Sequence, residues 1–130
     1  MNFPANLKYT ETHEWIKVEN DTATIGITDY AVSKLGDIVF LDLPKEGVNV
    51  KKGGPFCSIE SVKAVFDINS PVNGQITEAN KPLADNLELF KEDSYSKGWI
   101  IKIKIANKSE LDSLMDAKKY EEYVSKEEHH

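Results

Sequence analysis

Short stretches of alternating apolar and polar residues recur along this chain, and such alternation is typical of β-strands with one buried face. The clearest stretch is 99–105, where isoleucines alternate with two lysines. Residues 13–18 and 22–27 are rich in β-branched and aromatic types and are separated by Glu-Asn-Asp, which predicts a hairpin. Further strands are predicted at 37–43, 56–61, 65–69 and 74–78.

Clusters of turn-forming residues separate these stretches, at 45–55, 69–74 and 92–98. Short strands with turns at this spacing are typical of a small antiparallel sandwich or barrel. The cluster at 45–55 contains neither GxGxxG nor the P-loop pattern, so a nucleotide-binding fold is not predicted. The predicted fold class is therefore mainly β.

One short helix is predicted after the N-terminal hairpin. Thr28 is a suitable N-cap, Ala31, Val32 and Leu35 share one face, and Gly36 suits a left-handed helix end. The alternation of the strands thus gives way to helical periodicity for about two turns.

The tail is predicted to form C-terminal helices that cover the sheet. Ser109 and Asp112 form a capping-box pattern. Two apolar stripes follow, the first of Leu111, Leu114 and Met115 and the second of Ala117, Tyr120 and Val124. Because the stripes are out of phase, we expect a break near Asp116 and two short helices. Tyr120 and Tyr123 are expected to pack rather than to take part in chemistry.

The length of 130 residues predicts a single domain, with its core at about 7–106 and a helical cap at about 109–126. Residues 127–130 are set apart as a tail or the remnant of a tag, so His129 and His130 are not considered as site residues. Apolar runs are only a few residues long, so no segment is expected to span a membrane. The first residues lack the pattern of a leader, and we expect a cytoplasmic protein or a mature organellar form.

The charged residues argue against nucleic acid as a partner. There are 16 cationic and 22 acidic side chains, a net charge of -6, and every cation is a lysine. Without arginine the chain lacks the planar guanidinium group that forms paired hydrogen bonds to phosphate or guanine. The single cysteine, Cys57, excludes an internal disulfide and any CxxC motif, which fits a reducing compartment.

Catalytic constellations are not evident. His13 has no second histidine or cysteine at ligand spacing, so no metal site is predicted and a structural or surface imidazole is expected. Cys57 fits a small core residue better than a nucleophile. Glu14 and Asp67 are candidate site residues only if the fold brings their carboxylates together; otherwise they are expected to be ordinary solvated charges. Lys63 lies between two predicted strands and is flanked by Val62 and Ala64; its spacing alone fits an attachment point, a Schiff-base nucleophile or an ordinary solvated lysine.

Several blocks, in the same order, resemble the H proteins of the glycine cleavage system. They are YTETHEW, TIGITDYA, LGDIVFLDLP, ESVKA, SPVNGQI, DSYSKGWIIKIKI and AKKY. The resemblance implies a barrel-sandwich hybrid of the lipoyl and biotinyl type, with lipoate attached to Lys63 at the tip of a β-turn. Biotin domains have methionines on both sides of the lysine, and 2-oxoacid dehydrogenase lipoyl domains usually have Asp before it, whereas Val62 and Ala64 flank it here.

The resemblance also implies a function without catalysis by the chain itself. The lipoyl carrier would accept an aminomethyl group from the pyridoxal-phosphate-dependent glycine decarboxylase and pass it to the tetrahydrofolate-dependent aminomethyltransferase. Dihydrolipoamide dehydrogenase would reoxidise it, and lipoate-attaching enzymes would modify it. A monomer is expected. The alternative within the same fold is a lipoate reservoir that passes lipoyl groups to other carriers.

The site residues that the resemblance implies surround this lysine. Thr12, Glu14 and Asp67 would form the cleft for the arm, with Glu14 paired to the amine of the cargo. Glu60 and Gly74 would serve recognition by the attaching enzyme, and both Gly47 and Gly74 would lie in turns. Two departures stand out: Lys34 replaces a histidine of some members, and Val65-Phe66 replaces smaller or more polar residues, which places a bulky side chain close to the arm. Amide formation on one lysine would leave 22 acids against 15 cations, a charge of -7.

Overall fold

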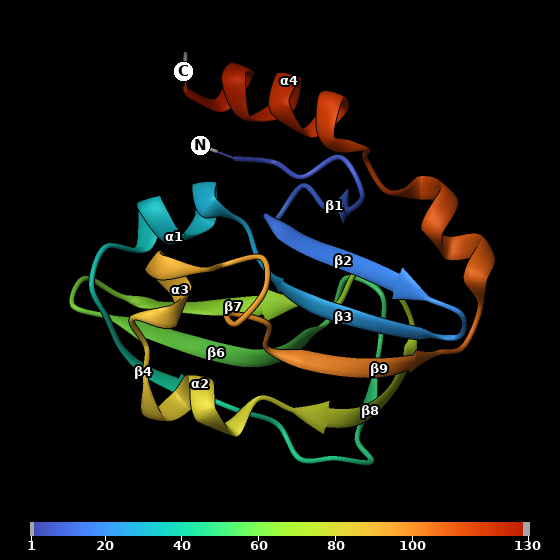
Figure 1. Cartoon of the computed structure of the whole chain (residues 1–130), viewed down its shortest axis with the longest axis horizontal. Coiled ribbons are helices and arrows are strands. Elements are labelled where there is room, and N and C mark those ends of the chain that lie inside the picture. Colours follow the sequence, from blue (N-terminus) through green and yellow to red (C-terminus); the bar gives the residue numbers. More distant parts are fainter. Residues whose placement is uncertain (1, 129–130) are drawn as a thin grey trace.

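The computed structural model describes residues 2–128 and contains two antiparallel sheets (Figure 1). The larger sheet has the strand order β1-β2-β3-β9-β8-β5 and the smaller one β4-β6-β7. The strands are β1 (Lys8–Tyr9), β2 (Glu14–Glu19), β3 (Thr22–Ile27), β4 (Ile38–Asp42), β5 (Asn49–Val50), β6 (Pro55–Ser61), β7 (Val65–Asn69), β8 (Gly74–Ala79) and β9 (Ile101–Ile105). The mainly β class is therefore confirmed.

The predicted hairpin and the alternating strand lie side by side in the larger sheet. Strands β2 and β3 pair with Glu14 opposite Ile27, and β3 continues the sheet to β9 with Ile25 opposite Ile101. In β9 all three isoleucines are buried, whereas Lys104 is exposed and Lys102 is half-buried. The period of two therefore identified the buried face of β9 correctly.

Helix α1 (Asp29–Leu35) confirms the predicted short helix. The Thr28 hydroxyl accepts a hydrogen bond from the Ala31 backbone N–H at 3.2 Å, as an N-cap should. Gly36 follows the helix with φ of +72°. Val32 and Leu35 are buried, which anchors the helix on the sheets and fixes the position of Gly36.

The tail forms two helices, as predicted, but the first helix begins at Lys108, one residue before the predicted start. The segments are the 3₁₀ helix η1 (Lys108–Ser113) and α4 (Ala117–Glu128). The capping residue is Asn107, whose side chain accepts from the Ser109 N–H at 3.1 Å, so the predicted capping box at Ser109 is wrong. Helix α4 lies beside the N-terminal segment and β1 (Figure 1). Its Tyr120 ring stacks on Tyr9 with centroids 4.6 Å apart, so the expected packing role of Tyr120 is confirmed.

Four short elements were not predicted. They are β1, β5, α2 (Lys81–Asp85) and α3 (Leu89–Glu92). Each is too short for a hydrophobic period to develop, and each depends on tertiary contacts. Leu83 of α2 and Phe90 of α3 are fully buried, so these helices close the edge of the core. Within residues 2–128, no helix combines the length and the apolar character needed to cross a membrane.

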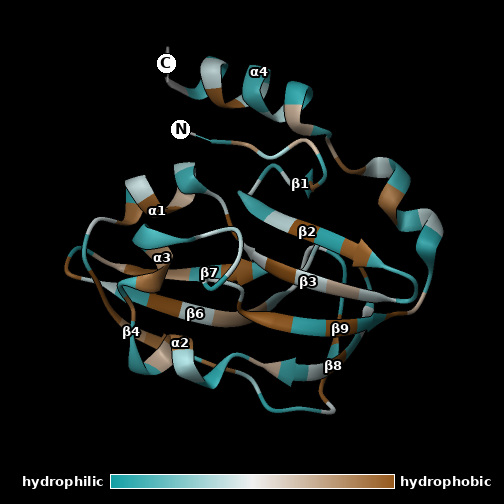
Figure 2. Cartoon of the chain, in the orientation of Figure 1, coloured by the Kyte–Doolittle hydropathy of each residue, from teal (hydrophilic) through white to brown (hydrophobic). Residues whose placement is uncertain are grey.

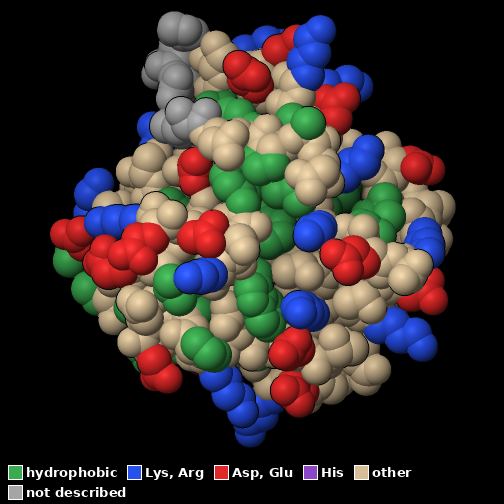
Figure 3. Space-filling model, viewed as in Figure 1, with side chains coloured by type: hydrophobic (Ala, Val, Ile, Leu, Met, Phe, Trp, Pro, Cys, Tyr) green, Lys and Arg blue, Asp and Glu red, His purple; other side chains and the backbone are tan. Residues whose placement is uncertain are grey.

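The core lies between the two sheets, where apolar residues of both meet (Figure 2). Ile25 and Ile103 of the larger sheet and Ile59 of the smaller one are inaccessible to solvent. The face seen in Figure 3 carries lysines and carboxylates interspersed. By contrast, several large apolar side chains near the β6–β7 turn remain exposed: Val39, Phe40, Val62, Val65 and Phe66.

Candidate functional site

The turn between β6 and β7 presents Lys63 to solvent. The Ser61 N–H donates to the Ala64 carbonyl at 2.8 Å. The Ser61 hydroxyl in turn accepts from the N–H groups of Lys63 and Ala64 at 3.2 and 3.3 Å. The Val62 N–H donates to the Asp37 carbonyl at 3.0 Å, which ties the turn to the start of β4. The backbone of Lys63 is thus held while its side chain remains accessible.

The Lys63 side chain lies against Gly36. A Cβ added to Gly36 would be 3.7 Å from Lys63 Cε and 3.9 Å from Nζ. The φ of +72° also favours glycine at this position. Leu35, the preceding residue, lines a cavity, so the lysine side chain lies beside one wall of that cavity.

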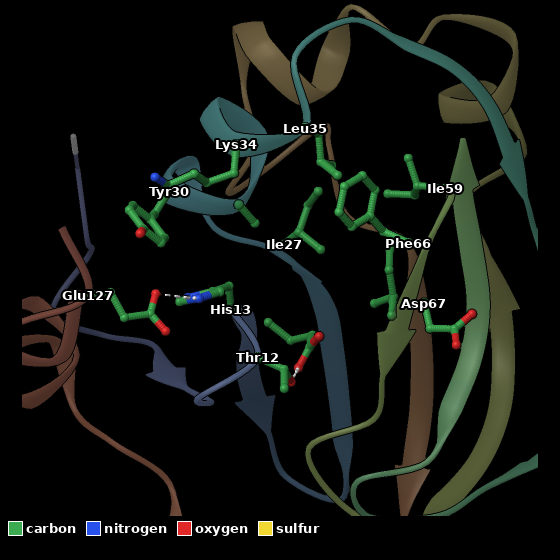
Figure 4. A pocket seen from close by; sticks show the side chains of 13 residues that line it. Thr12, His13, Ile27, Tyr30, Lys34, Leu35, Ile59, Phe66, Asp67 and Glu127 are labelled. Carbon is green, nitrogen blue, oxygen red and sulfur yellow. Dashed lines mark hydrogen bonds and ion pairs between the residues drawn. The ribbon is translucent and has the colours of Figure 1, made fainter. Parts of the chain in front are cut away.

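The cavity has a volume of about 270 Å³ (Figure 4). It lies between α1, the start of β2 with the residues just before it, β6, β7 and the end of α4. Its apolar lining consists of Ile27, Ala31, Leu35, Ile59, Phe66 and Ile68. Its polar lining consists of Thr12, His13, Glu14, Tyr30, Lys34, Asp67 and Glu127. A cavity of this kind suits an apolar chain that ends in a polar group.

Glu14 is a buried carboxylate at the polar end of this cavity, with 2% of its surface exposed. Its Oε1 accepts hydrogen bonds from the hydroxyls of Thr10 and Thr12 at 2.6 and 2.5 Å. Its Oε2 accepts from the Asn69 backbone N–H at 3.3 Å. Burial raises the pKa of Glu14 above its ordinary value, and the hydrogen bonds oppose that shift only in part. In residues 2–128 no cation forms an ion pair with it.

Asp67 also borders the cavity, but its carboxylate does not lie beside that of Glu14. Strand alternation along β7 directs the Phe66 ring inward, and Figure 4 shows the Asp67 carboxylate directed away from Thr12. Asp67 lies opposite Ser58 on the neighbouring strand and is exposed. The fold therefore brings both carboxylates to one cavity, with Glu14 inside and Asp67 at its rim.

His13 connects the C-terminal helix to the cavity, a role that the sequence did not indicate. Its Nδ1 is 2.8 Å from the Tyr120 hydroxyl, and its Nε2 is 3.1 Å from Glu127 Oε2. The Tyr120 hydroxyl is also 2.7 Å from the Thr28 hydroxyl. Glu127 was expected in a tail, but it belongs to α4 and lines the cavity. The two terminal histidines that were set apart lie outside the described residues.

The His13 contacts predict a pH dependence of stability. Burial lowers the pKa of His13 below its ordinary value, although Glu127 opposes the shift. The folded state therefore favours neutral imidazole, and this contribution is complete above about pH 6.5 and is lost as the pH falls below it. We expect the unfolding free energy of the parent to fall more steeply between pH 7 and pH 5 than that of His13→Asn, by at most about 1.4 kcal/mol per pH unit.

Asparagine is the suitable replacement because the φ of His13 is +74°, a region that asparagine tolerates. Urea unfolding at several pH values measures both proteins. Parallel pH profiles for the parent and His13→Asn would contradict the assignment of this pH dependence to His13.

Two further charged residues lie around the site. Lys34 borders the cavity, and its Nζ lies 5.2 Å from the centroid of the Tyr30 ring. Glu60 is exposed on β6, where it lies between Phe40 of β4 and Val65 of β7. Glu60 therefore belongs to the exposed surface around the turn rather than to the cavity.

The two glycines differ in their structural roles. Gly47 has φ of +87°, in agreement with its predicted turn. Gly74 instead begins β8, where a Cβ would lie 2.5 Å from the Lys104 carbonyl oxygen, so its glycine allows β8 and β9 to approach closely. Cys57 is buried, which raises the pKa of its thiol and agrees with the predicted core role.

Comparison with known proteins gives a consistent result over almost the whole chain. The family model described as glycine cleavage H-protein matches residues 7–127. The glycine cleavage system H protein of Bacteroides fragilis is 50% identical over 125 residues, covering 96% of this chain and 99% of that protein. That of Halothermothrix orenii is 48% identical over 128 residues, covering 98% and 100%. The crystal structure of the Mycobacterium marinum protein superposes with a TM-score of 0.85 at 32% identity, covering 96% of this chain and 98% of that chain.

Proposed function

The chain belongs to the glycine cleavage H-protein family, whose members carry an aminomethyl group on a lipoyl-lysine, and we propose that Lys63 is the lysine that bears the lipoyl group here. The protein is a carrier and not an enzyme. Its two sheets form the barrel-sandwich hybrid of this family. We propose that residues 1–130 constitute one carrier domain.

The residues around Lys63 fit a lipoyl group. The lysine is exposed on a turn with small neighbours, so an attaching enzyme can reach its ε-amine. The cavity beside it offers Ile27, Leu35 and Ile59 as apolar walls for a hydrocarbon chain that carries sulfur. When attached, the lipoyl group supplies the disulfide whose sulfur accepts the aminomethyl group.

We assign the binding of the cargo's amine to Glu14. Its carboxylate accepts hydrogen bonds from three neutral donors, including Thr12, and no cation of residues 2–128 forms an ion pair with it. A cationic amine supplies that partner, and a bond between opposite charges is stronger inside a cavity than in water. Asp67 at the rim adds negative charge on the path of the amine. The apolar walls keep water from the bound cargo, which slows its hydrolysis.

A single observation supports this assignment most strongly. A buried carboxylate that forms no ion pair within residues 2–128 lies in a partly apolar cavity that begins beside an exposed lysine. Burying an unpaired charge is costly, so such an arrangement is typical of a binding site rather than of a structural one.

The partners of the family are the P, T and L components of the glycine cleavage system. We infer that glycine decarboxylase loads this chain, the aminomethyltransferase unloads it and dihydrolipoamide dehydrogenase reoxidises it. The net charge of -6 fits docking through weak, salt-sensitive contacts by a monomer. Since B. fragilis and H. orenii, the source organisms of the compared relatives, are bacteria, we propose a cytoplasmic location, without a nucleic-acid or membrane partner.

Lipoate-attaching enzymes must also recognise the turn. We propose that exposed Glu60 contacts the attaching enzyme, since it is three residues before Lys63 and on the same strand that leads to the turn. Gly74 lies on the other sheet, and we propose that it affects this recognition indirectly, because it allows β8 and β9 to pack closely.

Mass spectrometry of the ligase-treated protein tests the attachment site. We expect one lipoyl adduct, and peptide mapping should place it on Lys63 because the other lysines lack the turn and its flanking apolar surface. A Glu60→Gln variant should be modified several-fold more slowly than the parent, with Glu46→Gln, another exposed glutamate, as its matched control. An adduct on another lysine, or none after treatment with a competent ligase, would overturn the proposal.

A further inference from the structure

Phe66 is the most exposed apolar residue that lines the cavity. The neighbours of its ring in Figure 4, Leu35 and Ile59, expose 6% and 0% of their surface, whereas Phe66 exposes 38%. Its ring points into the cavity between these two residues. An aromatic ring that is exposed inside a cavity gains free energy when a ligand covers it.

Strand β7 places this ring between the two ends of the site. Lys63 lies in the turn before the strand, and the N–H of Asn69, the last residue of the strand, donates to Glu14. Phe66 lies between them, and the strand rises by about 3.3 Å per residue. An arm that runs along β7 from Lys63 towards Glu14 therefore passes the Phe66 ring.

We propose that Phe66 is a positioning residue that holds the sulfur-bearing part of the lipoyl arm in the cavity, an inference that rests on the proposed attachment to Lys63. The ring supplies apolar area and a contact that sulfur favours. Leu35 and Ile59 are already covered and have little further surface to offer. Phe66 thus sets the fraction of time for which the arm is docked and its disulfide is shielded.

The neighbour Val65 provides a matched control. It precedes Phe66 on β7, it is 64% exposed, and it does not line the cavity. Because successive strand residues point to opposite faces, truncating Val65 removes exposed apolar surface without changing the wall that faces the arm.

The experiment measures how fast a phosphine reduces the disulfide of the arm in the lipoylated protein. Parent, Phe66→Ala, Phe66→Leu and Val65→Ala are lipoylated, their adduct on Lys63 is verified by mass, and new thiols are trapped with N-ethylmaleimide. Peptide mapping separates the arm from Cys57, which is buried. Free lipoamide gives the rate of an unshielded disulfide, and far-UV circular dichroism verifies the fold.

We expect Phe66→Ala to be reduced about three- to tenfold faster than the parent, Phe66→Leu to lie between them, and Val65→Ala to match the parent. Reduction of Phe66→Ala at the parent rate, or more slowly, would overturn the inference, since the ring would then be irrelevant or an obstruction. Reduction of the parent as fast as free lipoamide would also overturn it. Each of these results leaves the attachment to Lys63 intact, whereas a missing adduct on Lys63 defeats the proposed function and this inference together.

Discussion

Replacing Lys63 by arginine is expected to abolish aminomethyl transfer while leaving the fold unchanged. The guanidinium of arginine stays protonated and does not form the amide that attaches a lipoyl group. Lys63 is exposed, and the hydrogen bonds of its turn involve its backbone rather than its side chain. The free energy of unfolding should therefore change by no more than about 0.5 kcal/mol.

Transfer from labelled glycine to protein-bound and then folate-bound carbon, with the partner enzymes supplied, measures this effect. Lys97→Arg is the matched control, because Lys97 is also an exposed lysine in a turn. The control should retain the activity of the parent. Residual transfer by Lys63→Arg above the level without carrier would show that another lysine bears the group.

Replacing Glu14 by glutamine is expected to release the aminomethyl cargo about 10- to 100-fold faster, since a hydrogen bond to a charged group contributes about 1.5–3 kcal/mol. Glutamine keeps the shape of the side chain and removes its charge. Glu14 is the member of the predicted pair that lies inside the cavity, so Asp67→Asn should have a smaller effect. The measurement is the rate at which label is lost from isolated loaded protein.

A folding defect would not explain faster release of the aminomethyl group from Glu14→Gln. Because burial raises the pKa of Glu14, its stability contribution is complete below the unfolded value and is lost as the pH rises through the folded one. At pH 7 the charge therefore opposes folding, and Glu14→Gln should unfold at an equal or higher urea concentration than the parent. Glu46→Gln, a change at an exposed glutamate, serves as control. Unchanged release from Glu14→Gln would show that the carboxylate does not hold the amine.

The predictions of secondary structure succeeded where the pattern was long enough to carry a period. In β9 the alternation predicted the buried isoleucines, and around α1 Thr28 had the expected N-cap role. Gly36 has the expected positive φ, but its ψ of -137° lies outside the left-handed helical region. The two-residue strands and the helices α2 and α3 left no such signal. Their formation depends on pairing and burial, as with Leu83 and Phe90, rather than on local preference.

The arrangement of the candidate site divides in the same way. The turn around Lys63 is local, so Val62, Ala64 and the strands on both sides indicated it. His13 and Tyr120, by contrast, are 107 residues apart in the chain, and no spacing rule relates them. The same holds for Glu127, which reaches the cavity only because α4 packs beside β1.

By itself, then, the sequence determined the mainly β class, the family and an accessible lysine between two strands, because these follow from local periodicity and from motifs along the chain. The tertiary structure alone decided that Glu14 is buried and forms no ion pair within residues 2–128, that Phe66 rather than Asp67 points inward, and that α4 borders the cavity. The physical reason is that burial, ion pairing and the face of a strand that meets a cavity depend on contacts between segments far apart in the chain, which no local pattern specifies.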